Sequence, residues 1–331
     1  MSKKNIAIVY GGYSSEEVVS RKSADGIASF IDKSKYNIFP LYISNKKWSV
    51  IKDGNKYDVN RADFTVNING EIINFDCAYI TIHGTPGEDG VLQGYLQLLN
   101  IPHTTCDVMA SSLTFNKYIC NQFLKNFGFL VANSALVRKN KPYDIDSIAK
   151  ATGFPCFVKP NAGGSSFGIS KVKSMDQLDD AIQKAYTESN EVIIEQFIEG
   201  TELTCGLYKT LDKTTIFPIT EVISENEFFD YEAKYTAEKV TEITPARISA
   251  ELTKNIQEQS SKIYDLLNCK GFIRADYILQ GDKAFLLEVN TTPGMTSTSF
   301  IPQQIAAKNL NISDVFSDII EDAIKRVRED L

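Results

Sequence analysis

An α/β fold is the class that the sequence predicts. Segments typical of buried strands alternate with segments typical of amphipathic helices through the first hundred residues, and this alternation is typical of a parallel sheet with helices on its faces. Further along, two predicted strands flank a loop rich in glycine and serine at residues 163–168. Two other strands form a hairpin at residues 272–290 that alternates polar and apolar side chains.

The first predicted strand covers residues 5–10 and ends in the turn Gly11-Gly12. Ser14 and Glu17 have the spacing of a capping box, in which two side chains satisfy free backbone N–H groups at a helix start. We therefore expect a helix from this point to about Ile31. The other elements expected in this part are strands at residues 36–43 and 77–82 and a short amphipathic helix at residues 92–99.

The rest of the chain mixes strands and helices without an internal repeat. The helices expected here are at residues 112–127, 177–187, 250–267 and 313–327, and the strands at residues 154–159, 169–172, 192–197, 272–279 and 284–290. Residues 224–248 are polar, charged and aromatic with weak periodicity, which indicates a long functional loop. The last helix is amphipathic, and its apolar side consists of Val315, Phe316, Ile319, Ile320, Ala323 and Ile324.

Composition narrows the function classes. The net charge of −7 argues against nucleic acid or an anionic membrane as the main partner. No segment approaches the roughly 18–20 apolar residues of a membrane span, and the apolar run at residues 6–10 is too short for a signal peptide. The six cysteines lack C-x-x-C spacing, which indicates reduced thiols in a cytoplasmic protein. The chain has only two histidines, His83 and His103, so a His-rich zinc site or a Ser-His-Asp triad is poorly supported.

The loop at residues 163–168 has features of a phosphate site. Its glycines let backbone N–H groups approach an anion closely, Ser165 and Ser166 add hydroxyl donors, and Lys159 supplies a nearby cation. Ile169 stands where a Walker motif requires lysine, and the turn after the first strand lacks the spacing of a dinucleotide site. A P-loop and a nicotinamide site are therefore not supported, while a plain hairpin turn stays open as an alternative.

Four polar residues of the predicted hairpin form the most informative group. Because strand side chains alternate, Arg274 and Asp276 share one face of their strand, and Glu288 and Asn290 share a face of the next. With a turn centred near Asp282, Asp276 lies opposite Glu288 and Arg274 lies opposite Asn290, with opposed Cβ atoms about 4.5–5.5 Å apart. The apolar residues expected to pack behind are Ile273, Ala275, Leu287 and Val289.

Two facing carboxylates repel each other unless a cation lies between them. The side-chain oxygens of Asp276, Glu288 and Asn290 suit Mg²⁺, which keeps waters and substrate phosphates in its other positions. The hairpin therefore predicts a magnesium site. A solvated face of an exposed hairpin is the alternative, and the apolar strand composition disfavours it because buried charges need partners.

The hairpin also carries a resemblance to a known family. Its sequence, Gly271-Phe272-Ile273-Arg274-Ala275-Asp276 and Leu287-Glu288-Val289-Asn290-Thr291-Thr292-Pro293-Gly294-Met295-Thr296, resembles the D-alanine–D-alanine ligase family of the ATP-grasp fold. The resemblance runs from end to end. Further similar motifs are Gly11-Gly12-Tyr13-Ser14-Ser15-Glu16, His83-Gly84 with Gly87-Glu88-Asp89-Gly90 and Gln93-Gly94, Phe154-Pro155 with Val158-Lys159-Pro160, Gly164-Ser165-Ser166-x-Gly168, and Asp230-Tyr231-Glu232-Ala233-Lys234-Tyr235 in the mobile ω-loop.

The resemblance implies an α/β protein, with α+β character in its ATP-grasp part. It implies an N-terminal parallel-sheet domain at residues 1–105, a central ATP-grasp subdomain at 106–198, and a C-terminal subdomain at 199–331 with the ω-loop and metal site. It further implies ATP, two Mg²⁺ or Mn²⁺ ions, a homodimer and a role in peptidoglycan synthesis. In the implied reaction, the γ-phosphate of ATP moves to the carboxylate of one D-alanine, and the amine of a second D-alanine attacks that acyl-phosphate.

Residue roles carry over by position. The implied catalytic residues are Glu16, Ser165, Tyr235, Arg274, Gly294 and Ser299, with Arg274 and the Gly294 backbone as the oxyanion stabilisers. The implied ATP-binding residues are Lys117, Lys159, Ser166, Glu195, Gln196, Ile198, Glu202 and Lys234. The implied substrate-binding residues are Glu16, His83, Ser299 and Phe300, and the implied metal ligands are Asp276, Glu288 and Asn290.

Departures and alternatives bear on specificity. Gln196 stands where many members of this family have lysine, and Thr298 stands where histidine is common. Tyr235, in place of a phenylalanine, favours an amine over a hydroxy acid as second substrate.

Two competing functions stay open: a ligase for another amino-acid pair, and a catalytically silent ATP-binding module. The second is disfavoured because binding ATP alone would not need an arginine that stabilises an oxyanion. Without the resemblance, Ser299 is an ordinary loop serine and His83 a satisfied polar residue near a turn.

Overall fold

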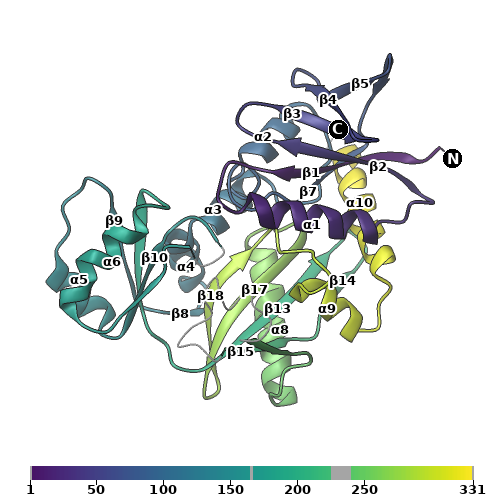
Figure 1. The fold of residues 1–331 in the computed structure, drawn as a ribbon. Helices are drawn as coiled ribbons and strands as arrows, with labels where there is room; N and C mark the ends of the chain where they lie inside the picture. The colour runs from purple at the N-terminus through teal and green to yellow at the C-terminus, as the bar shows by residue number, and fades with distance from the viewer. Residues whose placement is uncertain (1, 165–166, 225–239, 330–331) are drawn as a thin grey trace.

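The computed structural model describes residues 2–164, 167–224 and 240–329, arranged as three sheets with flanking helices around a central cleft (Figure 1). The α/β class is confirmed, with mixed rather than purely parallel sheets. The first sheet lies at the top of Figure 1, the second at the left, and the third connects them.

The first sheet has the strand order β6-β5-β4-β3-β2-β1-β7. Its predicted parallel part is present, as β1 (Lys4–Gly11) pairs in parallel with β2 (Tyr36–Ile43) and β7 (Cys77–Ile80). The helices of this part are α1 (Glu17–Phe30) and α2 (Val91–Leu98). Four antiparallel strands that were not predicted extend the sheet: β3 (Trp48–Lys52), β4 (Asn55–Asn60), β5 (Thr65–Ile68) and β6 (Glu71–Ile73).

A sequence signal for these strands was present. Asp53-Gly54 and Asn69-Gly70 have positive φ at both positions, as the tight turns of two-residue hairpins require. The strands they connect are short and have at most two buried side chains each, so hydrophobic alternation alone could not reveal them.

The capping box expected at the start of α1 is wrong. Ser14 Oγ donates to the carbonyl of His83 (3.0 Å) instead of capping the helix, and the N-cap residue Glu16 makes no side-chain cap bond. The carboxylate of Glu17 accepts from Tyr42 (2.9 Å) and Arg21 (3.1 Å). Ser14 and Glu17 therefore bond to residues distant in the sequence instead of capping the helix. These bonds hold the segment before α1 against the first sheet.

The second sheet is antiparallel, in the order β11-β10-β12-β9. Its strands are β9 (Ser134–Arg138), β10 (Cys156–Pro160), β11 (Ser170–Val172) and β12 (Glu191–Gln196), and helices α5 (Ile145–Thr152) and α6 (Leu178–Ala185) share its core. A 3-10 turn, Met175–Gln177, precedes α6. Of these elements, β9 and α5 were not predicted.

The single helix expected at residues 112–127 is two helices. They are α3 (Val108–Phe115) and α4 (Lys117–Lys125), and Asn116 between them has an extended backbone. The side chain of Asn116 accepts a hydrogen bond from Ile119 N (3.0 Å), so Asn116 is the N-cap of α4. This break starts a new helix at Lys117 and points its first turn at the cleft.

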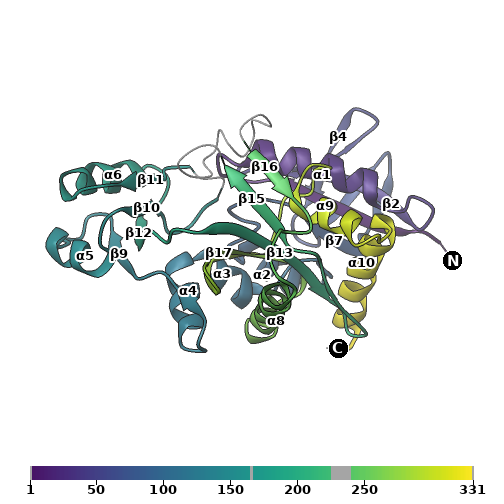
Figure 2. The ribbon, with the colours of Figure 1, turned by 90° about the horizontal axis from the view of Figure 1, so that it is seen from below.

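The third sheet carries the hairpin. Its order is β16-β15-β13-β17-β18-β8, with β14 (Thr214–Ile216) paired to β13. The strands are β8 (Leu130–Val131), β13 (Thr201–Lys209), β15 (Thr220–Ser224), β16 (Val240–Ile243), β17 (Gly271–Gln280) and β18 (Lys283–Asn290). Helix α8 (Ala250–Leu266) packs against the sheet (Figure 2), and α9 (Phe300–Ala307) follows the hairpin. The loop expected at residues 224–248 therefore contains a strand, β16, and residues 225–239 lie outside the described part.

The last helix, α10 (Ile312–Glu329), returns to the first sheet. All six of its predicted apolar residues are buried, which confirms its amphipathic pattern. Phe316 stacks on Tyr79 of β7 with ring centroids 5.5 Å apart, and Tyr36 donates to Glu321 (2.9 Å). The two ends of the chain thus share one hydrophobic core (Figure 1). The boundaries of the three predicted domains remain a prediction.

Candidate active site

A cleft of about 1480 Å³ lies where the three sheets meet. Every described residue with a predicted role lines it: Glu16, His83, Lys117, Lys159, Glu195, Gln196, Ile198, Glu202, Arg274, Asp276, Glu288, Asn290, Gly294, Ser299 and Phe300. Ser165, Ser166, Lys234 and Tyr235 lie outside the described residues, so their roles remain predictions.

The register of the hairpin is the one expected, with Asp276 opposite Glu288 and Arg274 opposite Asn290. The expected register assumed a turn centred near Asp282, whereas the observed one combines a shorter turn with a bulge. Gln280 pairs with Lys283, so the turn is Gly281-Asp282, and a bulge between Asp276 and Tyr277 then shifts the pairing by one residue.

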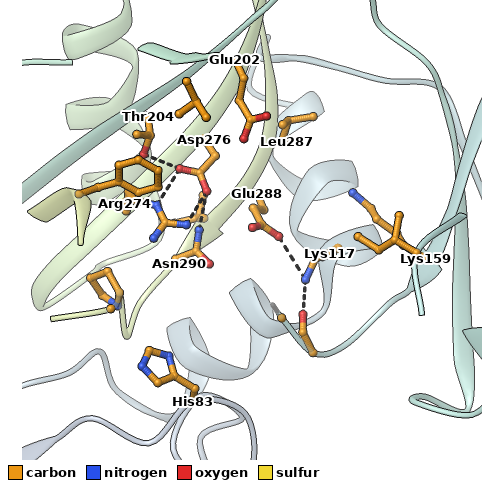
Figure 3. A pocket seen from close by; sticks show the side chains of 18 of the residues that line it. His83, Lys117, Lys159, Glu202, Thr204, Arg274, Asp276, Leu287, Glu288 and Asn290 are labelled. Carbon is orange, nitrogen blue, oxygen red and sulfur yellow. Dashed lines mark hydrogen bonds and ion pairs between the residues drawn. The ribbon is translucent and has the colours of Figure 1, made fainter. Parts of the chain in front are cut away.

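The bulge corrects one packing prediction. The extra residue is Leu287, which lines the cleft instead of packing behind the polar face, and Leu286 is the buried residue of this pair. Figure 3 shows Leu287 beside the polar cluster. A bulge next to an active site turns a side chain toward a ligand, and here it places an apolar surface beside the carboxylates.

Asp276 is the centre of a hydrogen-bonded cluster on the third sheet (Figure 3). Arg274 donates two hydrogen bonds to its carboxylate (2.9 and 2.8 Å), Asn290 donates one (2.9 Å), and Thr204 of β13 donates another (2.6 Å). Burial alone would lower the pKa of Arg274, but the Asp276 carboxylate raises it above its ordinary value. The guanidinium is therefore a fixed positive charge inside the cleft, and Glu202 points into the same space.

The two lysines enter from the other side (Figure 3). Lys117 Nζ lies 3.2 Å from Glu288 Oε2 and donates to the carbonyl of Gly163 (2.6 Å). Burial would lower the pKa of Lys117, but Glu288 raises it, so the ammonium stays charged. Lys159 Nζ lies 2.5 Å from Glu195 Oε2. These two cations converge on the space beside the glycine-rich loop, where a phosphate chain could lie.

Glu16 faces that loop. It is 5% exposed, and a Cβ atom added to Gly164 would lie 2.8 Å from Glu16 Oε1. The first and second sheets thus meet at this point, and only glycine leaves room for the carboxylate.

Glu88 is a cleft residue that sequence reasoning left without a role. Its carboxylate accepts from Gly84 N (2.6 Å). Burial and the neighbouring Glu16 raise the pKa of Glu88 to about 8. The signal available in the sequence was a lone glutamate inside the glycine-rich motif at residues 84–90, and its burial could not be read from that motif.

Ser23, which has no signal in the sequence, contacts the predicted site residue His83. Ser23 is fully buried on α1, 3.2 Å from His83 Nε2, and its Oγ accepts from Met295 N (3.3 Å). Burial lowers the pKa of His83, so the ring is neutral at neutral pH. Ser23 could not be identified from the sequence because its partners lie 60 and 272 residues away along the chain.

The segment after the hairpin completes the cleft. Ser299 Oγ accepts from Thr296 N (3.0 Å), and a Cβ atom added to Gly294 would lie 3.1 Å from this hydroxyl. The Arg274 guanidinium lies over the Phe300 ring, 5.3 Å from its centroid. Gly294, Ser299 and Arg274 therefore border one space, into which an oxyanion or a carboxylate could fit.

Family models describe both halves of the chain. The model for the D-ala D-ala ligase N-terminus matches residues 5–106, and that for the D-ala D-ala ligase C-terminus matches residues 123–321. The chain belongs to the D-alanine–D-alanine ligase family. The family signatures found in the sequence are thus confirmed as marks of membership, and the chain is an enzyme of the ligase class with an ATP-grasp fold.

Relatives and solved structures of this ligase family agree in length and fold. The D-alanine–D-alanine ligase of Bacteroides fragilis is 55% identical over 321 residues, covering 96% of this chain and 99% of that protein. That of Porphyromonas gingivalis is 47% identical over 331 residues, covering 99% and 100%. A solved structure of the VanG D-Ala:D-Ser ligase from Enterococcus faecalis has a TM-score of 0.86 at 32% identity, covering 97% of this chain and 100% of that one. The Bacillus anthracis D-alanine–D-alanine ligase complexed with ATP has a TM-score of 0.80 at 28% identity, with 100% of both chains covered.

Three further observations concern the described part of the chain. None of the helices in the described part of the chain combines the length and apolar composition of a membrane span. Across residues 2–164, 167–224 and 240–329, no three His, Cys, Asp or Glu side chains gather as a metal-binding group. The predicted metal set is smaller, with two carboxylates and the amide of Asn290. All six cysteines are free and buried, as expected of reduced thiols.

Proposed function

We propose that this chain joins two D-alanine molecules into D-alanyl-D-alanine at the expense of ATP, through a D-alanyl-phosphate, to supply peptidoglycan synthesis. The single observation that carries the proposal is the meeting in one cleft of Glu16, Lys117, Lys159 and the Asp276–Arg274 cluster. A silent binding module would not need a buried arginine aimed at the space beside Gly294.

Each part of the cleft has a task in this reaction. Lys117 and Lys159 bind the phosphates of ATP, and residues 195–198 with Glu202 hold the nucleoside. Glu16 binds the ammonium group of the first D-alanine. Transfer of the γ-phosphoryl group to its carboxylate forms a P–O bond to the substrate and breaks the bond to ADP.

The second half-reaction takes place beside Gly294. Ser299 and the N-terminus of α9 hold the carboxylate of the second D-alanine, with Phe300 beside it. Attack of its amine forms the C–N bond, and phosphate leaves as the C–O bond breaks. Arg274 and the Gly294 N–H stabilise the negative charge that develops on the carbonyl oxygen.

Mg²⁺ or Mn²⁺ fits the polar face of the hairpin. Asp276, Glu288 and Asn290 offer hard oxygen donors from adjacent strands, and the Asn290 amide nitrogen is the atom that contacts Asp276 (2.9 Å), which leaves the amide oxygen available. When bound, such ions neutralise negative charge on the transferring phosphoryl group. The carboxylates of Asp276 and Glu288 would hold two ions together with the ATP phosphates.

A homodimer in the cytoplasm is the assembly we propose. Leu98 on α2 (85% exposed) and Met109 on α3 (73% exposed) are large apolar side chains that a partner could cover. The free, buried cysteines support a reducing compartment. Light scattering at micromolar concentration measures the mass, and a monomer there would contradict the dimer.

A phosphate-release assay over a panel of D- and L-amino acids tests the function. We expect release with D-alanine alone, a ninhydrin-positive dipeptide product, and loss of turnover in excess chelator. Release only with a mixed pair, such as D-alanine with D-serine, would replace the proposed acceptor. No release with any acceptor would leave only a binding module, and turnover that survives the chelator would remove the metal assignment.

A further inference from the structure

Ser23 connects two parts of the cleft that come from opposite ends of the chain. It lies on the buried face of α1 together with Ser20, and both are fully buried. Ser20 bonds to the backbone at the ends of two strands of the first sheet, where it accepts from Gly11 N (3.0 Å) and donates to Thr81 O (2.7 Å). Ser23 instead contacts His83 and the backbone of Met295, the residue after Gly294.

The packing around Ser23 holds the Met295 backbone tightly. Gly26 lies one helical turn further along α1, and a Cβ atom added there would lie 2.1 Å from the Met295 carbonyl oxygen. The Met295 side chain is also buried. Helix α1 therefore fixes Met295, the residue that follows Gly294, by a hydrogen bond to its N–H and by close contact with its carbonyl.

The hydrogen bonds of Ser23 determine the state of His83. A serine hydroxyl carries one hydrogen, and Ser23 Oγ already accepts from Met295 N. Among the described residues, His83 Nε2 is the other partner of this hydroxyl. If Nε2 carried the ring proton and donated to Oγ, the hydroxyl hydrogen would have no acceptor in a fully buried place, which is unfavourable.

The opposite arrangement satisfies both Ser23 Oγ and His83 Nε2. The hydroxyl donates to an unprotonated Nε2, and the ring proton is on Nδ1. The ring stays neutral because burial outweighs the opposing influence of Glu16, while Arg274 acts in the same direction as burial. Since Nε2 is occupied by Ser23, Nδ1 is the nitrogen of His83 that remains for a ligand in the cleft.

We propose that Ser23 is a positioning residue, which holds His83 as the neutral Nδ1–H tautomer and fixes the Gly294–Met295 peptide. Nδ1–H then donates to a carboxylate oxygen of the bound amino acid, and Gly294 N–H keeps its direction toward the developing oxyanion. The effect on the oxyanion rests on the proposed function, whereas the tautomer does not.

The composition of the chain makes the tautomer measurable. It has only two histidines, so labelling with ¹⁵N-histidine gives a spectrum of two rings. Burial and Lys270 lower the pKa of His103 to about 4, so this ring is also neutral near pH 7 and serves as an internal reference. A protonated and an unprotonated ring nitrogen differ strongly in ¹⁵N shift. We expect Nδ1 of His83 to be the protonated one.

Ser23→Ala and Ser20→Ala are a matched pair of variants, because each removes one fully buried hydroxyl from the same helix face. We expect Ser23→Ala to move the His83 proton to Nε2, wholly or in part, and to lower kcat on the order of tenfold with the KM for ATP unchanged. Ser20→Ala should leave the His83 spectrum as it is in the unmodified chain.

Three results would overturn the proposal. They are an Nε2–H tautomer in the unmodified chain, equal spectral changes in both variants, and a loss in Ser23→Ala that falls only on the KM for ATP. If Ser23→Ala does not fold, the spectrum of the unmodified chain still decides the tautomer. If the chain forms no D-alanyl-D-alanine but shows the Nδ1–H form, the proposed function fails while the positioning of His83 stands.

Discussion

The two walls of the cleft hold their charges in different ways. On the hairpin wall, Arg274 is bonded twice to Asp276, two residues away on the same strand, and Asn290 and Thr204 bond the same carboxylate from neighbouring strands. On the lysine wall, Lys117 and Lys159 come from a helix and from another sheet, and each pairs with one glutamate.

This difference separates a fixed charge from exchangeable ones. The hairpin cluster is a network within one sheet, so a ligand finds it already arranged. The lysine pairs neutralise two buried cations until a polyanion arrives, and phosphate oxygens can then replace the glutamates as partners. Changes on the hairpin wall should therefore reduce the chemical step, and changes on the lysine wall should mainly weaken ATP binding.

The largest effect is expected on the hairpin wall. Asp276→Asn removes the charge that holds Arg274 and, in the proposed function, a metal ligand, so kcat should fall by about 10³-fold or more. Steady-state phosphate release measures it. Asp265→Asn removes an exposed carboxylate paired with Lys209 outside the cleft and should keep nearly full activity. Equal losses in the two variants would mean a general charge effect instead.

The lysine wall should respond through affinity. Lys159→Gln removes a cation that binds ATP phosphates in the proposed function, and we expect the KM for ATP to rise by about 10- to 100-fold with a smaller change in kcat. The control is Lys184→Gln on α6, in the same part of the molecule but outside the cleft, for which no change is expected. A fall in kcat with an unchanged KM would assign Lys159 to the chemical step and remove the contrast between the walls.

The hairpin wall was also the more predictable one. Alternation along two strands joined by a short turn predicted which of its four polar residues face each other, because these contacts are local. Even there, the correct register depended on a bulge at Leu287 that alternation cannot show, and Leu287 was placed on the wrong face. The family resemblance, not periodicity, gave the roles of Lys117, Glu16 and Ser299.

Long-range partners account for what the sequence did not reveal. Ser14 fits a capping box locally, yet it bonds the carbonyl of His83, 69 residues away. Ser23 and Glu88 have no distinctive motif of their own, and their significance lies in burial and in partners from other elements. Strands β3 to β6 could have been found from their Asp-Gly and Asn-Gly turns, since this signal is local.

Glu88 should make stability depend on pH. Its folded-state pKa of about 8 lies above the ordinary 4.5, since burial and Glu16 disfavour the charged form, with Lys117 opposing and Glu288 adding to the shift. The folded state therefore binds its proton more tightly than the unfolded state, and this stabilisation is complete below pH 4.5 and lost as the pH rises to about 8. Glu88→Gln should remove this pH-dependent fall in the free energy of unfolding. The free energy of unfolding of the variant minus that of the unmodified chain should therefore be about 1–3 kcal/mol larger at pH 8 than at pH 4.5.

Urea unfolding at both pH values measures this difference. The control variant is Glu191→Gln, which removes a carboxylate outside the cleft that pairs with Arg138 and accepts from Asn161 (2.9 Å). Parallel pH curves for Glu88→Gln and the unmodified chain would show that the carboxyl titrates at its ordinary pKa.

The smallest effect is expected at the start of α4, where the lysine wall begins. Asn116→Ala removes the side chain that caps α4 and should lower the free energy of unfolding by about 1 kcal/mol. Asp107→Ala removes the matching cap of α3, a bond to Ala110 N (3.0 Å), and should destabilise the chain by a similar amount. Only Asn116 directly precedes Lys117, so only its loss should also raise the KM for ATP, by a few-fold. If both variants change stability and neither changes the KM, the position of Lys117 is set by its contacts with Glu288 and Gly163 and not by the helix start.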